Sequence, residues 1–243
     1  MPFLFLSPST QDFNPYVTTG NEQLWMNRLA DRMTPYLHAS GINVTRNDPN
    51  ANAATSIRLS NEGNYDFHLA LHSNASSEEN RGKNRGIEVY YYPTSDDGLR
   101  MANILVDHLK EIYPLPEQVR AISTTVLGEV RRTKAPSVLV EFGYHDNVDD
   151  ANWLTENLET VAQATAQSVT EYFGVPFLPV IEPRQAAARQ TVNLRSLPSV
   201  DSPILAQIPE NGTFFVLGQF DEWYSARTDT VYGYVLSRDV ELT

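Results

Sequence analysis

Apolar residues recur along the first 175 positions in two patterns, one typical of buried strands and the other of amphipathic helices. Strand-like apolar runs occupy residues 3–7, 42–47, 65–72, 86–92 and 137–143. Apolar positions at helical spacing occupy about 21–40, 96–112 and 149–174. This alternation predicts an α/β domain with three layers, αβα, around a mostly parallel sheet. In such sheets, ligands bind beyond the carboxyl ends of the strands.

The pattern changes after residue 175. Prolines at 176, 179 and 183 are followed by a run of small residues, which predicts a linker over 177–189 between a first domain, 1–176, and a second domain, 190–243. The second domain contains short alternating segments separated by turn residues. We expect it to form a small all-β barrel.

Composition narrows the function classes. The chain has 243 residues, a net charge of −12 and no dense basic cluster, so we expect no nucleic acid partner. It has no cysteine, so any metal must be bound by histidine, carboxylate or amide oxygen. The N-terminus lacks the basic region of a signal peptide, and no segment approaches the ~20 apolar residues of a membrane span.

Three residues with chemically useful side chains stand where elements of the first domain begin or end. Glu22 opens the first helix, His72 ends the strand "YDFHLALH", and Glu141 ends the apolar run "SVLVE". A glutamate at a helix start also has a capping role, because it complements the helix dipole. Glu141 is harder to explain in this way, since a buried carboxylate is costly unless a cation or donor compensates it.

The motifs around these residues resemble the zinc-dependent N-acetylmuramoyl-L-alanine amidases of the amidase-3 family. They are "NE" at 21–22, "LALHSNAS" at 69–76, "RGIEVYYYP" at 85–93 and "APSVLVEFGYHDN" at 135–147. The resemblance implies a bound Zn²⁺, with Glu22 and His72 as ligands and Glu141 as the catalytic carboxylate. Asn74 is the candidate for substrate binding.

One motif departs from the family. Its first strand normally ends in Gly-His-Gly, whose histidine is a zinc ligand, whereas this chain has "LSPSTQDFNPY". His68 lies roughly 13 Å from His72 along the strand, too far to share one ion, and is predicted to be a buried, hydrogen-bonded residue behind the site. Gln11 is the first choice for the third ligand. His145 is one alternative, and water or no metal is the other.

The tail resembles bacterial SH3 domains. "VNLRSLPSVDSPILAQIPENGTFFVLGQFDEWYSAR" and "YGYV" carry the resemblance over residues 190–243. Trp223, Tyr224 and Tyr234 could belong either to the core of this SH3-like barrel or to a ligand-binding face.

Together these features predict a peptidoglycan hydrolase that cleaves the N-acetylmuramoyl–L-alanine amide bond with zinc-activated water and a glutamate base. It would act on the cell wall, outside the cell or after release by lysis. Two alternatives remain open. One is a catalytically silent wall-binding protein on a degenerate amidase fold, and the other is a zinc peptidase that cuts the stem peptide.

Overall fold

The computed structural model describes residues 2–243, and packing divides them into two compact units. One unit contains residues 4–33 and 45–169. The other contains 34–44 and 170–243, together with Pro2 and Phe3. Each unit is described by itself below. Across residues 2–243, no helix combines the length and the apolar character needed to cross a membrane.

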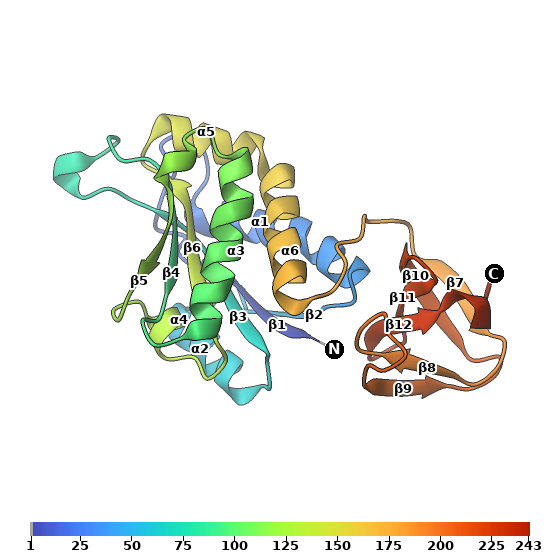
Figure 1. Cartoon of the computed structure of the whole chain (residues 1–243). Helices are drawn as coiled ribbons and strands as arrows, with labels where there is room; N and C mark the ends of the chain where they lie inside the picture. Colours follow the sequence, from blue (N-terminus) through green and yellow to red (C-terminus); the bar gives the residue numbers. More distant parts are fainter. Residues whose placement is uncertain (1) are drawn as a thin grey trace. The chain divides into compact units, whose positions relative to one another are not determined.

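A six-stranded sheet with the order β2-β1-β3-β6-β4-β5 forms the centre of the amidase-like part of the chain (Figure 1). Its strands are β1 Phe3–Pro8, β2 Asn43–Arg46, β3 Phe67–Asn74, β4 Ile87–Tyr91, β5 Val119–Ser123 and β6 Ser137–Tyr144. Strands β1, β3 and β6 are parallel. Strand β4 runs antiparallel to β6 and parallel to β5. The predicted α/β architecture with a mostly parallel sheet is confirmed, and the antiparallel β4 was not predicted.

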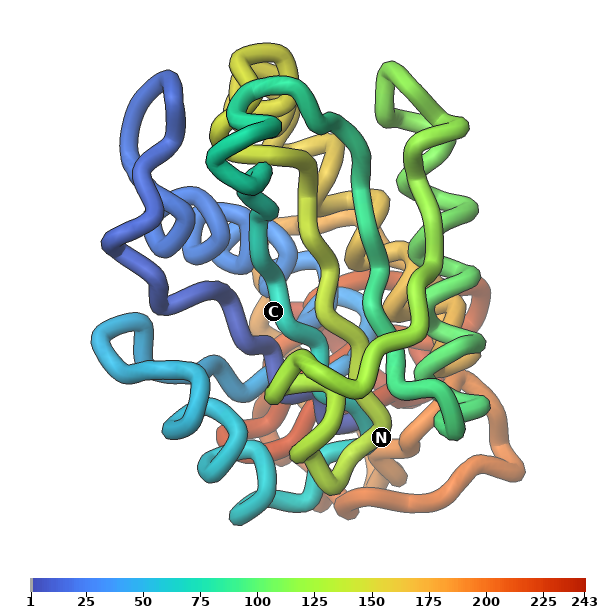
Figure 2. The backbone as a smooth tube through the Cα atoms, turned by 90° about the vertical axis from the view of Figure 1, so that its left-hand side faces the viewer, coloured from blue at the N-terminus to red at the C-terminus, as the bar shows by residue number. Residues whose placement is uncertain are grey.

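Helices lie on both faces of this sheet. They are α1 Glu22–Ala39, α2 Ala53–Glu62, α3 Asp96–Ile112, α4 Gly128–Arg131, α5 Val148–Glu156 and α6 Leu158–Phe173. In Figure 2, α1, α3 and α6 lie behind the sheet, whereas α2 and the short α4 cross only the lower end of the face toward the viewer. The upper end of that face, where β3 and β6 end, is not crossed by a helix.

Side chains alternate between the two faces of β3, as strand geometry requires. Phe67, Leu69 and Leu71 are fully buried on one face. His68 and His72 lie on the opposite face, which α2 and α4 cover in part. The alternating sequence of this strand therefore separates the hydrophobic core from the polar site.

Several elements differ from their sequence predictions. The segment predicted as one helix over 149–174 forms two, α5 and α6, because Asn157 ends α5. Strand β5 and helices α2 and α4 were not predicted. Helix α2 carries no strong apolar stripe, and α4 is only one turn long.

A seven-stranded antiparallel sheet, ordered β13-β7-β10-β11-β12-β8-β9, forms the SH3-like part. Its strands are β7 Arg184–Ala188, β8 Val192–Arg195, β9 Ile204–Ile208, β10 Thr213–Phe220, β11 Trp223–Arg227, β12 Tyr232–Leu236 and β13 Val240–Leu242. Strand β7 lies in the stretch predicted as a linker, and it pairs with β10 and β13.

Two aromatic residues of the SH3-like motifs are part of the packed interior. Tyr234 is fully buried and donates a hydrogen bond to the Ser40 carbonyl at 2.6 Å, and Trp223 is also buried. Tyr224 is only partly buried and packs against the apolar core of the sheet. Trp223 and Tyr234 therefore serve packing and are not available as a ligand-binding surface.

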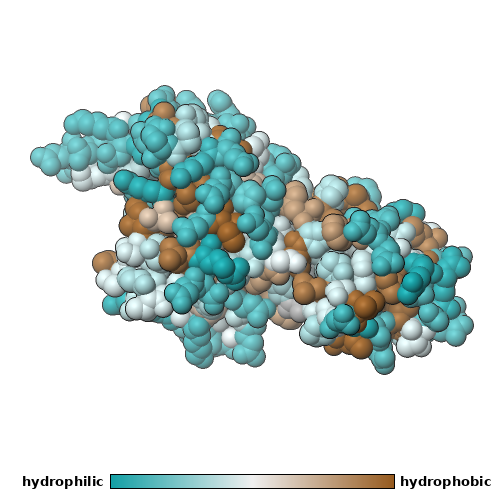
Figure 3. Space-filling model, in the orientation of Figure 1, coloured by the Kyte–Doolittle hydropathy of each residue, from teal (hydrophilic) through white to brown (hydrophobic). Residues whose placement is uncertain are grey.

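The face of the molecule seen in Figure 3 is mainly hydrophilic, with apolar residues in small groups. This surface agrees with the chain's net charge of −12.

Candidate active site

A row of polar residues crosses four neighbouring strands of the first sheet, β3, β6, β4 and β5. His72 on β3 pairs in register with Glu141 on β6, and Glu141 pairs with Glu88 on β4. Glu88 in turn pairs with Arg120 on β5. Because β4 and β5 run opposite to β6, residues at their starts meet residues at the ends of β3 and β6.

A bulge shapes this edge of the sheet. The register between β3 and β6 shifts after the His72–Glu141 pair. Gly143 on β6 adopts a positive φ of 82°, and a Cβ there would lie 3.2 Å from the Asp150 side chain. Bulges of this kind redirect strand ends and are frequent beside active sites.

His72 lies between two carboxylates. Its Nδ1 is 2.8 Å from Glu22 Oε1, and its Nε2 is 3.2 Å from Glu129 Oε2. Since a carboxylate can only accept, each contact requires a proton on the facing ring nitrogen. Burial would lower the pKa of His72, but hydrogen bonds to Glu129 and Glu22 raise it well above its ordinary value.

Glu129 joins the two histidines of β3. Its Oε1 accepts hydrogen bonds from Ser7 Oγ at 2.5 Å and from His68 Nε2 at 3.2 Å. His68 Nδ1 contacts Ser60 Oγ at 2.9 Å. Burial opposes the charge of Glu129, yet the hydrogen bonds from His68 and His72 hold its pKa well below the usual range. His68 is thus a fully buried, hydrogen-bonded residue behind His72.

Glu22 is the first residue of α1 and belongs to a second hydrogen-bond chain. Asn14 Nδ2 donates to Glu22 Oε2 at 2.7 Å and to Gln11 Oε1 at 3.1 Å. Burial would raise the pKa of Glu22, but hydrogen bonds led by the one from His72 lower it. Its role is therefore more than helix capping.

Gln11 lies in the turn after β1, close to His72. Its amide nitrogen is 3.4 Å from His72 Nδ1, while its oxygen faces Asn14. To offer oxygen to a metal, this amide must turn over, which would bring its nitrogen against the Asn14 amide nitrogen. The Asn14 hydrogen bond therefore favours the orientation that keeps the Gln11 oxygen away from His72.

Glu141 has an unsatisfied oxygen. The side chain is half-buried, and its Oε2 is shielded from solvent without a hydrogen-bond partner. Burial raises the pKa of Glu141 to about 8; His72 opposes this rise, whereas Glu22 and Glu88 add to it. A carboxyl group in this state can accept and return a proton near neutral pH.

Glu88 is the second buried carboxylate beside Glu141. It accepts hydrogen bonds from Asn74 Nδ2 at 3.1 Å, from the Tyr90 hydroxyl at 2.5 Å and from Arg120 at 2.6 Å. These donors satisfy Glu88, in contrast to Glu141. They also fix the side chain of Asn74, the predicted substrate-binding residue, against β4.

His145 is held in a neighbouring part of the site. Its Nδ1 lies 2.9 Å from the Ser73 carbonyl oxygen and 3.1 Å from Ser73 Oγ. The ring stacks on Tyr16 with centroids 5.5 Å apart. These contacts direct Nδ1 toward Ser73 and not toward the Glu22–His72 pair.

A cavity of about 430 Å³ opens beside His72 and Glu129. The turn after β1 provides Gln11, Asp12 and Phe13, and the segment leading into α2 provides Asn52 and Ala53. Phe13 is 72% exposed, so it presents an apolar surface at the cavity. The cavity gives a ligand access to His72.

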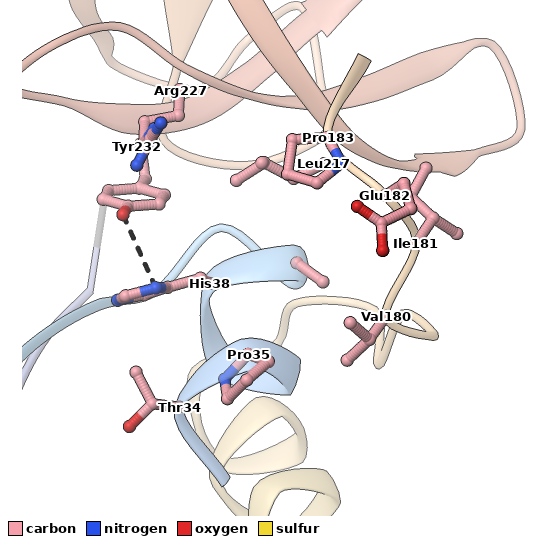
Figure 4. A pocket seen from close by; sticks show the side chains of 11 residues that line it. Thr34, Pro35, His38, Val180, Ile181, Glu182, Pro183, Leu217, Arg227 and Tyr232 are labelled. Carbon is pink, nitrogen blue, oxygen red and sulfur yellow. Dashed lines mark hydrogen bonds between the residues drawn. The ribbon is translucent and has the colours of Figure 1, made fainter. Parts of the chain in front are cut away.

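A second cavity, about 520 Å³, lies within the unit formed by 34–44 and 170–243 (Figure 4). His38 stacks on Tyr232 there, and Val180, Ile181 and Leu217 provide apolar walls. Burial, aided by Arg227, lowers the pKa of His38 to about 4. The cavity contains none of the predicted site residues.

The residues around His72 suit a zinc-type cation in their donor chemistry. Imidazole and carboxylate are zinc ligands, and Glu22 is already in contact with the ring. The orphaned Glu141 oxygen is the kind of buried acceptor that a cation compensates. Within residues 2–243, however, no three His, Asp or Glu side chains are arranged as a ready metal-binding group.

Sequence reasoning identified Glu22, His72 and Glu141, and the structure brings these three together. It missed Glu129 and Glu88. Glu88 left a signal, because it is the charged position in the otherwise apolar strand segment "GIEVYYY". Glu129 left none, because its one-turn helix has no recognisable pattern.

Family models match two separate parts of the chain. The family model described as N-acetylmuramoyl-L-alanine amidase matches residues 12–171, and that of the bacterial SH3 domain matches 190–241. A search of curated proteins found no match.

Three solved structures illustrate the fold. The N-acetylmuramoyl-L-alanine amidase AmiC2 of Nostoc punctiforme has a TM-score of 0.62 at 18% identity, covering 71% of this chain and 97% of its own. The catalytic domain of the amidase CwlV from Bacillus (Paenibacillus) polymyxa has 0.62 at 19%, covering 72% and 100%. The catalytic domain of the CD27L endolysin targeting Clostridia difficile has 0.58 at 22%, covering 70% and 97%.

Proposed function

Because this chain belongs to the N-acetylmuramoyl-L-alanine amidase family, we propose that it hydrolyses the amide between N-acetylmuramic acid and L-alanine in peptidoglycan. The observation that carries the proposal is Glu141. Glu141 pairs in register with His72, and His72 contacts the carboxylate of Glu22. The Oε2 atom of Glu141 is shielded from solvent and has no hydrogen-bond partner.

We propose that Glu22 and His72 hold a zinc ion, with Gln11 or His145 as candidates for a third protein ligand. Bound zinc would polarise the scissile carbonyl and lower the pKa of water, which would make that water a better nucleophile toward the carbonyl. Gln11 can serve only after its amide turns over, since its nitrogen now faces His72. His145 has its Nδ1 directed at Ser73, so it would serve through Nε2.

Glu141 would act as the proton carrier. Its carboxylate accepts a proton from the attacking water and returns the proton to the departing amine of L-alanine. Without a bound cation, burial raises the pKa of Glu141 to about 8, and a cation beside it would lower this pKa and favour the carboxylate that accepts the proton. Asn74, fixed by Glu88, offers a backbone and side-chain surface beside this acid for orienting the substrate.

The SH3-like barrel would bind the cell wall and raise the local concentration of substrate. The partner of the whole chain is then peptidoglycan, and the place of action is the cell wall. The buried state of Trp223 and Tyr234 means that other residues of the barrel would make the contact.

The missing strand-end histidine favours one rival, a wall-binding protein without activity. The decisive experiment compares wild type with Glu141→Gln on purified peptidoglycan after zinc reconstitution, with product analysis by mass spectrometry. We expect new L-alanine amino termini from wild type and about 10² to 10⁴-fold slower release from the variant, with zinc content unchanged.

Glu62→Gln is a matched control, since this glutamate is exposed on α2 and pairs with Arg58. It should release product at the wild-type rate. Equal activity of Glu141→Gln and wild type would remove Glu141 from the mechanism. No product from zinc-loaded wild type would support the silent binding protein, and new amino termini other than L-alanine would indicate a peptidase.

A further inference from the structure

We infer that Glu129 is a positioning residue for His72: it binds the ring at Nε2 and leaves Nδ1, beside Glu22, as the nitrogen that would ligate the metal. The inference rests on the proposed zinc-dependent function and adds a residue to it. Neither the amidase motifs nor the composition of the chain points to Glu129.

The contacts of His72 divide cleanly between its two nitrogens. Glu129 Oε2 is 3.2 Å from Nε2, whereas Glu22 Oε1 and the Gln11 amide lie on the Nδ1 side at 2.8 and 3.4 Å. Two of the candidate metal ligands thus gather at one nitrogen, and Glu129 is alone at the other.

Glu129 is itself held rigidly. Ser7 and His68 both donate to its Oε1, so that only Oε2 is directed at His72. Only 4% of the residue is exposed. A buried carboxylate without donors would be costly, and three donors from β1 and β3 compensate it here. This arrangement fixes the position of the Oε2 atom relative to the ring.

A histidine that binds a metal through one nitrogen usually donates the N–H of the other to a carboxylate or carbonyl, which fixes the tautomer and the ring orientation. Glu129 supplies such a carboxylate at Nε2. It cannot reach a cation bound at Nδ1, because it contacts the opposite side of the ring. Its effect on the metal is therefore indirect.

The test uses the full-length chain with ¹⁵N-labelled histidine, as wild type, Glu129→Gln and Glu88→Gln. Glu88 is a matched control, since it is also a buried glutamate on this face but contacts Asn74, Tyr90 and Arg120 and not His72. Long-range ¹H–¹⁵N spectra report the state of both His72 nitrogens, and chelator competition reports zinc affinity.

In the metal-free protein we expect a protected His72 Nε2–H signal in wild type and Glu88→Gln, and its loss or displacement in Glu129→Gln. Zinc affinity should fall about 10- to 100-fold in Glu129→Gln. The loss of zinc affinity should be clearly smaller in Glu88→Gln. With ¹¹³Cd in place of zinc, scalar coupling should appear at His72 Nδ1.

Three results would overturn the inference: an unchanged Nε2–H signal in Glu129→Gln, equal losses of zinc affinity in the two variants, or cadmium coupling at Nε2. The last is measured on wild type and does not depend on the variant folding. If wild type binds no metal and hydrolyses nothing, the proposed function fails, whereas the metal-free spectra still decide whether Glu129 holds His72.

Discussion

Replacing Glu141 by glutamine should change how the stability of the metal-free protein depends on pH. Burial raises the pKa of Glu141 from its usual 4.5 to about 8 in the folded chain. Between these two values the unfolded chain carries an ionised Glu141, while the folded chain keeps it protonated. The folded state then binds more protons, so its stability falls as pH rises through this interval.

The size of the effect follows from the pKa interval. It spans 3.5 pH units, and each unit corresponds to ~1.36 kcal/mol, which sets an upper bound of about 5 kcal/mol. The side chain is only half-buried, so solvent screening reduces the expected change to about 2–4 kcal/mol. Glutamine has the same shape but no charge to lose, and it should not show this decline.

Urea unfolding at pH 5 and pH 9, in the presence of a chelator, measures the effect. The free energy of unfolding of Glu141→Gln relative to wild type should increase by about 2–4 kcal/mol from pH 5 to pH 9. Glu62→Gln, on the exposed face of α2, should follow wild type at both pH values. A constant difference between Glu141→Gln and wild type would show that folding does not raise the pKa of Glu141.

Two further predictions concern the third ligand and the barrel. Gln11→Ala should lower zinc affinity, measured by chelator competition, more than His68→Ala does. Gln11 lies beside His72 Nδ1, whereas His68 contacts Glu129. Loss of zinc from His145→Ala but not from Gln11→Ala would instead assign the ligand to the loop after β6. Deleting residues 184–243 should lower hydrolysis of intact walls far more than hydrolysis of a soluble muramoyl-peptide, because a tethered binder acts through local concentration. Equal losses on both substrates would show that the barrel acts through structure.

The sequence predicted the α/β and all-β parts because their strands have strong apolar patterns. It also predicted Glu22, His72 and Glu141, since Glu22 opens a helix and the other two stand near the ends of apolar strands. Strand direction was not predictable in the same way. The reversal of β4 depends on pairing between distant segments, and only that pairing places Glu88 beside Glu141.

Glu129 shows a second limit of sequence reasoning. Its importance comes from three donors on β1 and β3, more than 50 residues away in sequence. Local patterns carry no trace of such contacts. The orientation of the Gln11 amide is similar, because it is decided by Asn14 and not by Gln11 itself.

The reversed direction of β4 has a consequence for substrate selection. Strand β3 ends and β4 begins at the same edge of the sheet, with β6 between them, so that residues 75–86 must pass across the site's edge. This loop projects from the body of the domain (Figure 1). Asp146 accepts hydrogen bonds from the Ser76 and Gly82 amides, and Asn147 donates to the Gly82 carbonyl.

With its base anchored in this way, the exposed residues 77–81 have no part in the core. Variation in their length and charge should therefore leave His72 and Glu141 undisturbed. We expect such variation to tune which peptidoglycan stems the enzyme accepts, and exchange of this loop offers a route to altered specificity on an unchanged catalytic sheet.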